Sequence, residues 1–461
     1  MPTPSPARPN ILFIMADQFR TRSMSGLGDG IETPNIDRIR QKAVWFPRAA
    51  CTAPLCTPSR ASLATGKMPS HCGVLEHDAD LPIDQTTYYQ LLRRSGYRVA
   101  VSGKTDLHKK VRYLGRRPLP IIYHLGFTES RETEGKMNSA WFDRDPDGTI
   151  RPWGPYQQFL EKADPGAVVK LREDYLDRLR NKPTYYAAPS VLPADEFLDT
   201  YIGRDACDFL EQIDDDTPWH FFVSFAGPHN PWDPPKEEVD RLGDKTYPKT
   251  PRDTLEGKPD WVKKRAAASS GDMTDEDLNN TKLHYDGAIQ VIDRWIGRML
   301  DVLERRGLME NTVIIFAADH GEMMGEHGMF AKTTMYEGAL RVPLLIHLPG
   351  MQGAVTSDAP AMLMDLAPTI LDLAQVSYDA SAMDARSLAP ILRGEDCPLR
   401  GAQISELRNI MMVCDGRYKW IRNWNDRDEL YDLETDPDEM HNVIADHPQV
   451  VAALKKHTFT H

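Results

Sequence analysis

Four mostly apolar runs of the chain each end in polar residues. They cover residues 10–15, 97–102, 220–225 and 312–317, and a fifth run covers residues 342–348. Apolar runs of this length are typical of strands buried on both faces of a parallel sheet. Because ligands of open α/β sheets bind beyond the carboxyl ends of the strands, we expect the polar tips of the first four runs to share one crevice.

Segments with helical periodicity alternate with these strands. Helices are predicted over residues 34–45, 85–95, 278–306 and 363–373. In the third segment the apolar positions from Tyr285 to Leu303 fall on one side of a helix, as in a helix with one buried face. Strands that alternate with helices predict an α/β fold with a large, mostly parallel sheet flanked by helices.

The pattern changes after about residue 385. Short antiparallel strands are predicted over residues 402–406, 409–414, 418–423 and 429–433, followed by a last helix over residues 448–457. We therefore expect an α/β domain over residues 1–384 and a small α+β subdomain with an antiparallel sheet over residues 385–461. Residues 109–195 and 233–277 show little periodicity, and we expect them to be inserted, loop-like segments that bind ligands or make packing contacts.

Composition and charge narrow the class of protein. The chain of 461 residues has a formal net charge of −13, which argues against nucleic acid or an anionic membrane as a general partner. No apolar run reaches the length of a membrane span, and residues 1–9 lack the apolar segment of a secretory signal. The six cysteines are scattered without a CxxC pair. We therefore expect a reduced, cytoplasmic protein.

Residues 51–66 predict a short helix with both ends marked. Thr57 suits the N-cap, Pro58 the first helical position and Gly66 the C-terminal stop. Cys56 would then lie just before the helix start, where free N–H groups favour an anion. Arg60, one turn further on, can bind the same anion through two N–H groups. Taken alone, Cys56 is either a nucleophile or a small buried side chain.

Polar residues at two strand tips suggest a site for one divalent metal ion. Asp17, Gln18 and Asp319 offer oxygen ligands that suit Ca²⁺ or Mg²⁺, and His320 suits a softer ion such as Mn²⁺. Each of these residues alone would more often cap a helix or bond within a loop. Acidic residues at two separate tips favour the metal site.

A set of cations is expected around the metal ion. It consists of Arg60, Lys104, His108, His229 and Lys332. Cations around a metal ion and a nucleophile suit the transfer of a sulfuryl or phosphoryl group, because catalysis there depends on stabilising charge on the peripheral oxygens. Lys109 and Lys110, by contrast, are expected to be solvated surface charges.

The stretch from Cys56 to Gly66 resembles the signature C-x-P-S-R-x-x-L-x-T-G of the type I, formylglycine-dependent sulfatases of the alkaline phosphatase superfamily. The likeness covers nearly the whole chain, and the sequence is most similar to the arylsulfatase, choline sulfatase and phosphonate monoester hydrolase branches. Further similar motifs follow in family order: Asp17-Gln18, Thr33 to Asp37, Gly103-Lys104, Pro228-His229, Asp319-His320-Gly321, Gly325 to Gly328, Lys332, Tyr336-Glu337, Arg341 to Pro343, and Glu429 to Leu433 with Asp436-Pro437, Glu439 and Asn442.

The resemblance implies that a maturase oxidises Cys56 to formylglycine, whose hydrate attacks sulfur with one hydroxyl. The second hydroxyl then restores the aldehyde and expels sulfate. Ca²⁺ is the expected ion, with Mg²⁺ or Mn²⁺ as alternatives. The implied metal ligands are Asp17, Gln18, Asp319, His320 and the residue at position 56. Asp319 also accepts the proton of the nucleophile, Arg60 orients the hydrate, and Lys104, His229 and Lys332 bind the sulfate and assist the leaving oxygen.

Three departures from the family pattern bear on the substrate. Gln18 and His320 stand where many sulfatases have Asp and Asn, and both variants are similar to the phosphonate monoester hydrolase branch. The usual G-K-x-H motif here reads Gly103-Lys-Thr-Asp-Leu-His108. Either His108 serves the role of the missing histidine from a shifted position, or Asp106 occupies its space.

The leading hypothesis is therefore hydrolysis of a small sulfate monoester to an alcohol or phenol and inorganic sulfate. The alternative is a phosphonate monoester or phosphodiester hydrolase with the same site, or an enzyme that does both. A non-catalytic anion-binding protein with a decayed site is a third hypothesis, which the filled nucleophile, metal and cation positions disfavour. A homo-oligomer is the default expectation for the assembly.

Overall fold

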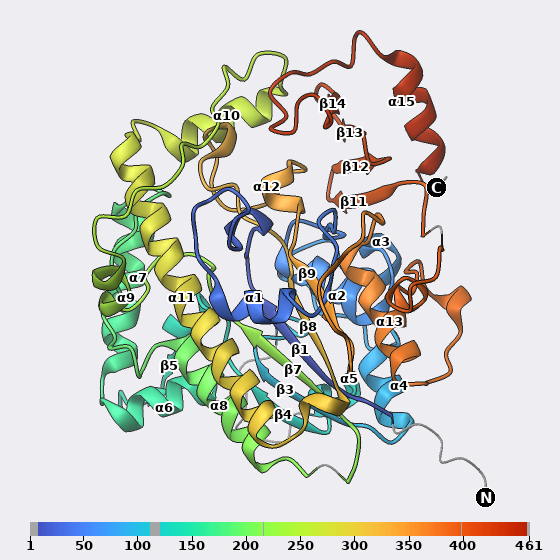
Figure 1. Cartoon of the computed structure of the whole chain (residues 1–461). Coiled ribbons are helices and arrows are strands. Elements are labelled where there is room, and N and C mark those ends of the chain that lie inside the picture. The colour runs from blue at the N-terminus through green and yellow to red at the C-terminus, as the bar shows by residue number, and fades with distance from the viewer. Residues whose placement is uncertain (1–7, 111–119, 215, 398, 459–461) are drawn as a thin grey trace, which may run out of the picture.

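The computed structural model describes residues 8–110, 120–214, 216–397 and 399–458 (Figure 1). Its main feature is an eight-stranded sheet in the order β10-β2-β9-β8-β1-β7-β3-β4. From β8 to β4 all neighbouring strands are parallel, whereas β9 runs antiparallel to both of its neighbours. The strands are β1 (Asn10–Ala16), β2 (Val44–Trp45), β3 (Arg98–Gly103), β4 (Glu129–Glu132), β7 (Trp219–Phe225), β8 (Thr312–Ala318), β9 (Leu344–His347) and β10 (Val355–Thr356). The predicted mostly parallel sheet is confirmed.

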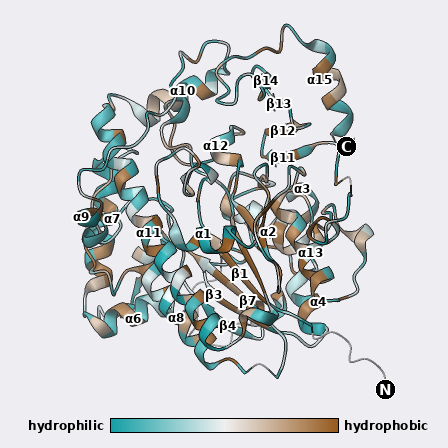
Figure 2. Cartoon of the chain, viewed as in Figure 1, coloured by the Kyte–Doolittle hydropathy of each residue, from teal (hydrophilic) through white to brown (hydrophobic). Residues whose placement is uncertain are grey.

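The centre of this sheet is apolar throughout. Every residue of β1, β7 and β8 is buried, and Figure 2 shows hydrophobic residues concentrated in the central strands. Such strands gain about 25 cal/mol for each Å² of apolar surface removed from water. The uninterrupted apolar runs in the sequence are therefore the cause of this layer.

Helices cover both faces of the sheet (Figure 1). On one face α8 (Leu198–Gln212) packs on β7 and β3, and α11 (Asp275–Arg305) packs on α8 and on α1 (Pro34–Arg40). On the other face α2 (Cys56–Thr65), α4 (Tyr88–Arg94) and α13 (Leu366–Leu373) pack together. Capping boxes begin α4 at Thr87 and α11 at Thr274, which satisfies N–H groups that the first helical turn leaves free. No helix in the described part of the chain is long and apolar enough to cross a membrane.

Two local predictions were wrong. The helix expected over residues 34–45 ends at Arg40, because Val44 and Trp45 pair with β9 as strand β2. Thr57 is not an N-cap: α2 begins at Cys56 with Leu55 in the capping position, and Thr57 Oγ1 instead donates to the carbonyl of His77 at 2.7 Å. Gly66 does end the helix, in the left-handed conformation with φ 67°.

The stretches expected to be loops contain several regular elements, and for these elements the expectation was wrong. Residues 243–259 form no helix or strand, as expected, and residues 111–119 lie outside the described residues. Within 109–195, β4 extends the parallel sheet, and helix α7 packs beside α6. Short or strongly charged helices leave little periodicity in the sequence, which explains the error. The added elements are α5 (Pro120–Leu125), β5 (Asp143–Arg144), β6 (Ile150–Arg151), α6 (Pro155–Ala163), α7 (Ala167–Asn181), α9 (Lys236–Leu242) and α10 (Asp260–Ser270).

The C-terminal part forms the predicted antiparallel sheet. It consists of β11 (Gln403–Leu407), β12 (Ile410–Cys414), β13 (Tyr418–Asn423) and β14 (Glu429–Asp432), followed by α15 (Pro448–Leu454). Val413, Trp420 and Leu430 form its core with Met68 and Met362 from the first part of the chain. The division at residue 385 stays a prediction. The remaining short helices are α3 (Pro69–Cys72), α12 (Glu337–Leu340) and α14 (Ala389–Leu392).

Candidate active site

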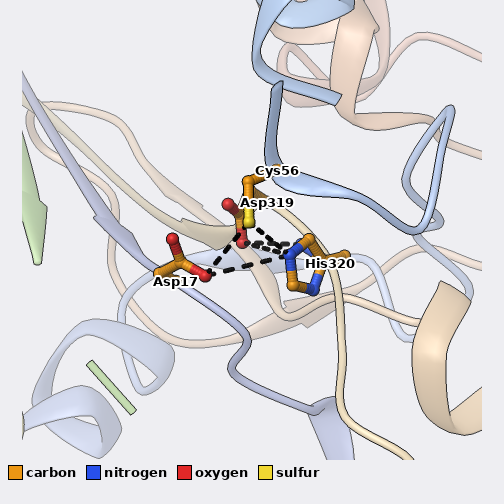
Figure 3. A group of neighbouring side chains, drawn as sticks. All are labelled: Asp17, Cys56, Asp319 and His320. Atoms are coloured by element: carbon orange, nitrogen blue, oxygen red, sulfur yellow. Dashed lines mark hydrogen bonds and ion pairs between the residues drawn. The ribbon is translucent and has the colours of Figure 1, made fainter. Parts of the chain in front are cut away.

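Four buried side chains from three separate segments converge at the carboxyl edge of the parallel strands (Figure 3). Asp17 follows β1, Asp319 and His320 follow β8, and Cys56 begins α2. One ligand atom from each lies within 4.8 Å of the others. We call these four residues the acidic cluster.

The strand register explains this convergence. Ala16, the last residue of β1, pairs with Phe225 of β7 and with Ala318 of β8. The residues that follow these strands therefore emerge side by side at one edge of the sheet. The N–H of Asp17 donates to the carbonyl of Gly227 at 3.0 Å, which holds the first tip against the third. The polar tips of β1, β7 and β8 therefore meet at one edge of the sheet, as predicted.

His320 presents one ring nitrogen to the cluster. Its Nδ1 lies 2.9 Å from the carbonyl oxygen of Gly321, so Nδ1 carries the proton that this acceptor requires. The lone pair of Nε2 then faces Cys56 Sγ at 3.1 Å. A backbone partner on the far nitrogen is the usual device that fixes a metal-binding histidine.

Arg60 orients both carboxylates of the acidic cluster. Its Nε lies 2.8 Å from Asp319 Oδ2, and its Nη2 lies 3.4 Å from Asp17 Oδ2. Nη1 donates to the carbonyl of Lys104 and to Ser224 Oγ, both at 2.8 Å. Because Arg60 takes the Oδ2 atoms, the Oδ1 atoms of both aspartates are left to face His320 Nε2, at 3.7 and 3.8 Å.

This donor set fits a divalent cation. Two carboxylate oxygens, an imidazole nitrogen and the atom at position 56 meet at a point that is closed to solvent. Like charges buried together are costly unless a cation compensates them. Carboxylate oxygens suit Ca²⁺ and Mg²⁺, and the imidazole extends the choice to Mn²⁺.

Gln18 adjoins the cluster with its amide held at both ends. Lys332 Nζ donates to Gln18 Oε1 at 2.6 Å, and Gln18 Nε2 donates to Glu322 Oε2. The backbone N–H of Gln18 donates to Asp319 Oδ1 at 3.0 Å. The structure thus places Gln18 and Lys332 next to the acidic cluster, as the sequence led us to expect.

Lys104 and His229 complete a ring of basic side chains around the acidic cluster. Lys104 Nζ contacts Asp17 Oδ2 and lies 2.9 Å from Asp106 Oδ2. His229 Nδ1 lies 2.5 Å from the carbonyl oxygen of Asn230. Burial, followed by the charge of Lys332, holds the pKa of His229 well below its usual value.

The charges of this ring shift the ionisation of the cluster. Burial raises the pKa of Asp17, but Lys104 and other cations reverse that effect and hold it well below its usual range. Burial and Asp17 likewise raise the pKa of the Cys56 thiol, and again the surrounding cations lower it well below the ordinary value. Cys51, a few residues away, feels mainly burial, which raises its pKa.

His108 lies outside this ring. Its Nε2 is 2.9 Å from Glu132 Oε2, and in the described residues no hydrogen bond or ion pair joins it to the acidic cluster. Asp106 instead pairs with Lys104 and so lies nearer to the acidic cluster; which of the two takes the role of the missing histidine stays a prediction. Lys109 was expected to be a solvated surface charge, and this was wrong. Its Nζ lies 2.6 Å from Asp106 Oδ1.

Three residues of the site were not predicted from the sequence. Ser224 binds Arg60, Glu322 binds Gln18, and the carbonyl of His77 accepts the bond from Thr57 beside Cys56. Ser224 carries a weak signal, as a polar residue near the end of an apolar run, and Glu322 follows the tip Asp319-His320-Gly321 directly. His77 gives no such signal.

Comparison with known proteins decides the family. The family described as Sulfatase matches residues 9–376, which is most of the chain. The chain belongs to the sulfatase family. A second family, described as N-sulphoglucosamine sulphohydrolase, C-terminal, matches residues 325–460.

Relatives of this sulfatase extend over nearly its whole length. It is 28% identical over 461 residues to a choline-sulfatase of Rhizobium meliloti (strain 1021). The aligned region covers 96% of this chain and 83% of the relative. The chain is 29% identical over 459 residues to an arylsulfatase of Clostridium perfringens (strain 13 / Type A), covering 95% and 90%. This sulfatase is accordingly a sulfuric ester hydrolase.

Solved structures share its fold. A phosphonate monoester hydrolase of Agrobacterium radiobacter superposes with a TM-score of 0.79 at 24% identity, over 97% of this chain and 94% of the other. A structure solved with D-glucosamine-2-N,6-O-disulfate superposes with a TM-score of 0.77 at 24% identity, over 97% and 96%. The mostly parallel sheet flanked by helices is therefore the family fold.

Proposed function

We propose that this sulfatase hydrolyses a sulfate monoester to an alcohol or phenol and inorganic sulfate, with residue 56 as its nucleophile after oxidation of the cysteine to formylglycine. The observation that supports this most directly is the position of Cys56 Sγ, 3.1 Å from His320 Nε2 and 3.6 Å from Asp17 Oδ1. The sulfur stands in the place that an oxygen of the formylglycine hydrate would take. When formed, this hydrate supplies an oxygen nucleophile for the sulfur of the ester.

The proposed metal ligands are Asp17, Gln18, Asp319, His320 and the residue at position 56. The oxygen-rich set favours Ca²⁺, with Mg²⁺ or Mn²⁺ as alternatives. When bound, the cation offsets charge on the sulfate oxygens and favours the ionised nucleophile. Arg60 holds the two aspartates in the orientation that such an ion requires.

The other residues of the site act on the proton and on the substrate charge. Asp319 is the proposed acceptor of the proton that the nucleophile loses. Lys104 is paired with Asp106, and Lys332 donates to Gln18. Both ammonium groups lie beside the acidic cluster and can bind sulfate oxygens there. With His229 they are the proposed groups that stabilise the leaving oxygen.

The first experiment tests the nucleophile. The protein is produced together with a formylglycine-generating maturase, and the mass of the peptide that contains residue 56 is measured. We expect the side chain of residue 56 to have lost its sulfur and two hydrogens and to have gained one oxygen, as in an aldehyde. We also expect turnover of an aryl sulfate that Cys56→Ala lowers by about 10⁴–10⁶-fold. The matched control is Cys51→Ala, which removes a neighbouring buried thiol and should keep activity within a few fold. Loss of activity in both variants would point to a folding defect.

The second experiment tests the metal ion. Treatment with a chelator should abolish aryl sulfate hydrolysis, and stepwise addition of Ca²⁺, Mg²⁺ or Mn²⁺ should restore it. Restoration at the lowest concentration by Ca²⁺ would support the proposed ion. Full activity after the chelator has removed all bound metal would contradict the proposed site.

A second candidate function is hydrolysis of a phosphonate monoester or phosphodiester at the same site. Gln18 and His320 favour it, because they stand where many sulfatases have Asp and Asn. Comparing kcat/KM for aryl sulfates, phenylphosphonate esters and phosphodiesters separates the two functions. If the converted, metal-loaded protein cleaves only the phosphorus esters, the sulfatase proposal fails. The cytoplasmic location and a homo-oligomer stay predictions.

A further inference from the structure

A polar cavity of about 260 Å³ opens beside the acidic cluster. Its wall comes from the loops that follow β3 and β4, from the loop at His77, and from the segment before α6. Because β3 and β4 run parallel to β1, these loops emerge at the same edge of the sheet as Asp17. We call this space the β3–β4 cavity.

Two contacts join the β3–β4 cavity to the acidic cluster. Asp106 lines the cavity and lies 2.9 Å from Lys104 Nζ, which in turn contacts Asp17. On another side, the carbonyl of His77 accepts the hydroxyl of Thr57, the neighbour of Cys56. The β3–β4 cavity therefore adjoins the acidic cluster on the side of Lys104 and Thr57.

The cavity holds buried polar atoms that lack partners among the described residues. Glu134 is 2% exposed, and its Oε2 has no hydrogen-bond partner there. The same is true of His108 Nδ1 and His77 Nδ1, and both rings line the cavity. Buried polar atoms in native proteins are nearly always paired, so these three are suited to the hydroxyl groups of a ligand.

The charges of the wall are largely neutralised within it. Asp106 pairs with Lys104 and Lys109, and Glu132 pairs with His108. Burial raises the pKa of Glu134 to about 7, although nearby backbone N–H groups lower it, so its carboxyl can donate as well as accept. Among the described residues, Trp153 is the single Trp, Tyr or Phe of the wall, whereas sites for quaternary ammonium ions use several aromatic rings.

We propose that the β3–β4 cavity binds the leaving group, and that this group is a neutral, polyhydroxylated ring the size of one monosaccharide. The inference rests on the proposed function. The volume lies just below the usual range for ligand sites of about 300–1,000 Å³, which suits a single ring rather than a longer chain. Glu134, His108 and Asn138 are the residues that would contact its hydroxyl groups.

The test compares substrates within each variant. For the converted holoenzyme, kcat/KM is measured with a panel of glucose monosulfates that differ in the sulfated position, with 4-nitrophenyl sulfate and with a quaternary ammonium alkyl sulfate. We expect Glu134→Leu and Asn138→Ala each to lower the ratio of sugar sulfate to aryl sulfate about tenfold, the value of one lost hydrogen bond. Glu134→Gln, which keeps a donor and an acceptor, should restore most of the ratio. Glu237→Gln, exposed on α9, is the control.

Equal losses on sugar and aryl sulfates in both Glu134→Leu and Asn138→Ala would overturn the proposal, because they would show a structural effect alone. The proposal would also be overturned if kcat/KM were highest for the quaternary ammonium alkyl sulfate and Glu134→Gln removed that preference. Binding to the Cys56→Ala protein separates this inference from the proposed function. Tighter binding of a glucose monosulfate than of inorganic sulfate, lost in Glu134→Leu, supports the cavity even if no sulfate ester is turned over.

Discussion

Glu322 shows how one buried side chain can set the orientation of a candidate metal ligand. Its Oε1 accepts N–H groups of Met324 and Ala331, at 2.9 and 2.6 Å, and its Oε2 accepts Gln18 Nε2. Because the nitrogen of the Gln18 amide is held by Glu322, the oxygen must point the other way, toward Lys332 Nζ. Glu322 is not itself a proposed metal ligand, yet it decides that the oxygen of the Gln18 amide, rather than its nitrogen, is the atom available to bind the metal ion.

We therefore expect Glu322→Gln to weaken metal binding. If the new amide keeps its oxygen on the two backbone N–H groups, its NH₂ meets the NH₂ of Gln18, and the Gln18 amide must turn. The loss of metal affinity should be about 10–100-fold, as is usual when a group that orients a ligand is removed. It is measured as the Ca²⁺ concentration that gives half-maximal activity and by calorimetry.

A compensating change tests this explanation against a general loss of structure. Gln18→Glu in the Glu322→Gln background restores an acceptor opposite the new NH₂ and keeps a partner for Lys332. The double variant should bind Ca²⁺ more tightly than Glu322→Gln alone. If it binds no better, the orienting role of Glu322 is wrong.

At the scale of elements, the end of β3 determines where Lys104 can lie. Gly103 has φ 92°, and a Cβ there would lie 2.0 Å from the carbonyl oxygen of Ser224 on β7. This close approach lets the N–H of Lys104 donate to the same carbonyl at 3.0 Å, and the carbonyl of Lys104 accepts Arg60 Nη1. The tight turn at the end of β3 thus fixes the positions of Lys104 and Arg60 in the site.

Gly96 provides a matched control for this turn, because it also has φ 92° but a Cβ there would meet nothing within 4 Å. We expect Gly96→Ala to lower the free energy of unfolding by about 1–2 kcal/mol, the cost of the left-handed conformation. Gly103→Ala should lower it by more than about 4 kcal/mol, because backbone must move as well. Urea denaturation measures both, and equal losses would show that the approach to Ser224 is unimportant.

At the scale of the whole molecule, a buried ion-pair network joins α12 to the C-terminal sheet. Lys419 of β13 is fully buried, and its Nζ lies 2.9 Å from Glu337 Oε1 and 2.6 Å from Glu439 Oε1. Arg341 pairs with the other oxygen of Glu337. Several of these residues belong to the motifs that resemble the sulfatases, yet their contacts connect α12 to the C-terminal sheet rather than line the acidic cluster.

Lys419→Met should lower the free energy of unfolding by about 3–5 kcal/mol at neutral pH, because it leaves the buried carboxyl group of Glu439 without its cation and leaves Glu337 with Arg341 alone. Burial raises the pKa of Glu337, but Arg341 and Lys419 lower it to about 2. Since this value lies below the unfolded pKa of about 4.3, ionised Glu337 stabilises the fold above that pH, and the contribution is lost as the pH falls toward 2.

The difference between wild type and Lys419→Met should therefore shrink as the pH falls below about 4.5, where Glu337 without Lys419 takes up a proton. Denaturation curves at several pH values check this. Arg417→Met, which removes a half-exposed pair with Asp432, should leave stability nearly unchanged. A difference that grows on acidification would mean that Glu337 is not stabilised by Lys419.

The parts of the fold that could be predicted are those with local causes. Apolar runs gave the strands, and the C-terminal strands were placed within a residue or two at each end. The short strand β2 was missed because pairing with β9, far along the chain, overrides a helical pattern. Helices α5 and α6 were missed because they are short, and α7 because its apolar positions are sparse among charged ones.

By itself, the sequence determined that Asp17, Asp319 and His320 would meet, because they follow buried parallel strands that end at one edge. For Cys56 it was the resemblance to the sulfatases that implied a place among them. The sequence also indicated the family, through the local signature from Cys56 to Gly66. The positions of His108, Glu322 and the β3–β4 cavity were decided only by the tertiary structure. They depend on contacts between segments far apart in the chain, such as Glu322 with Gln18, which no local pattern of polar and apolar residues encodes.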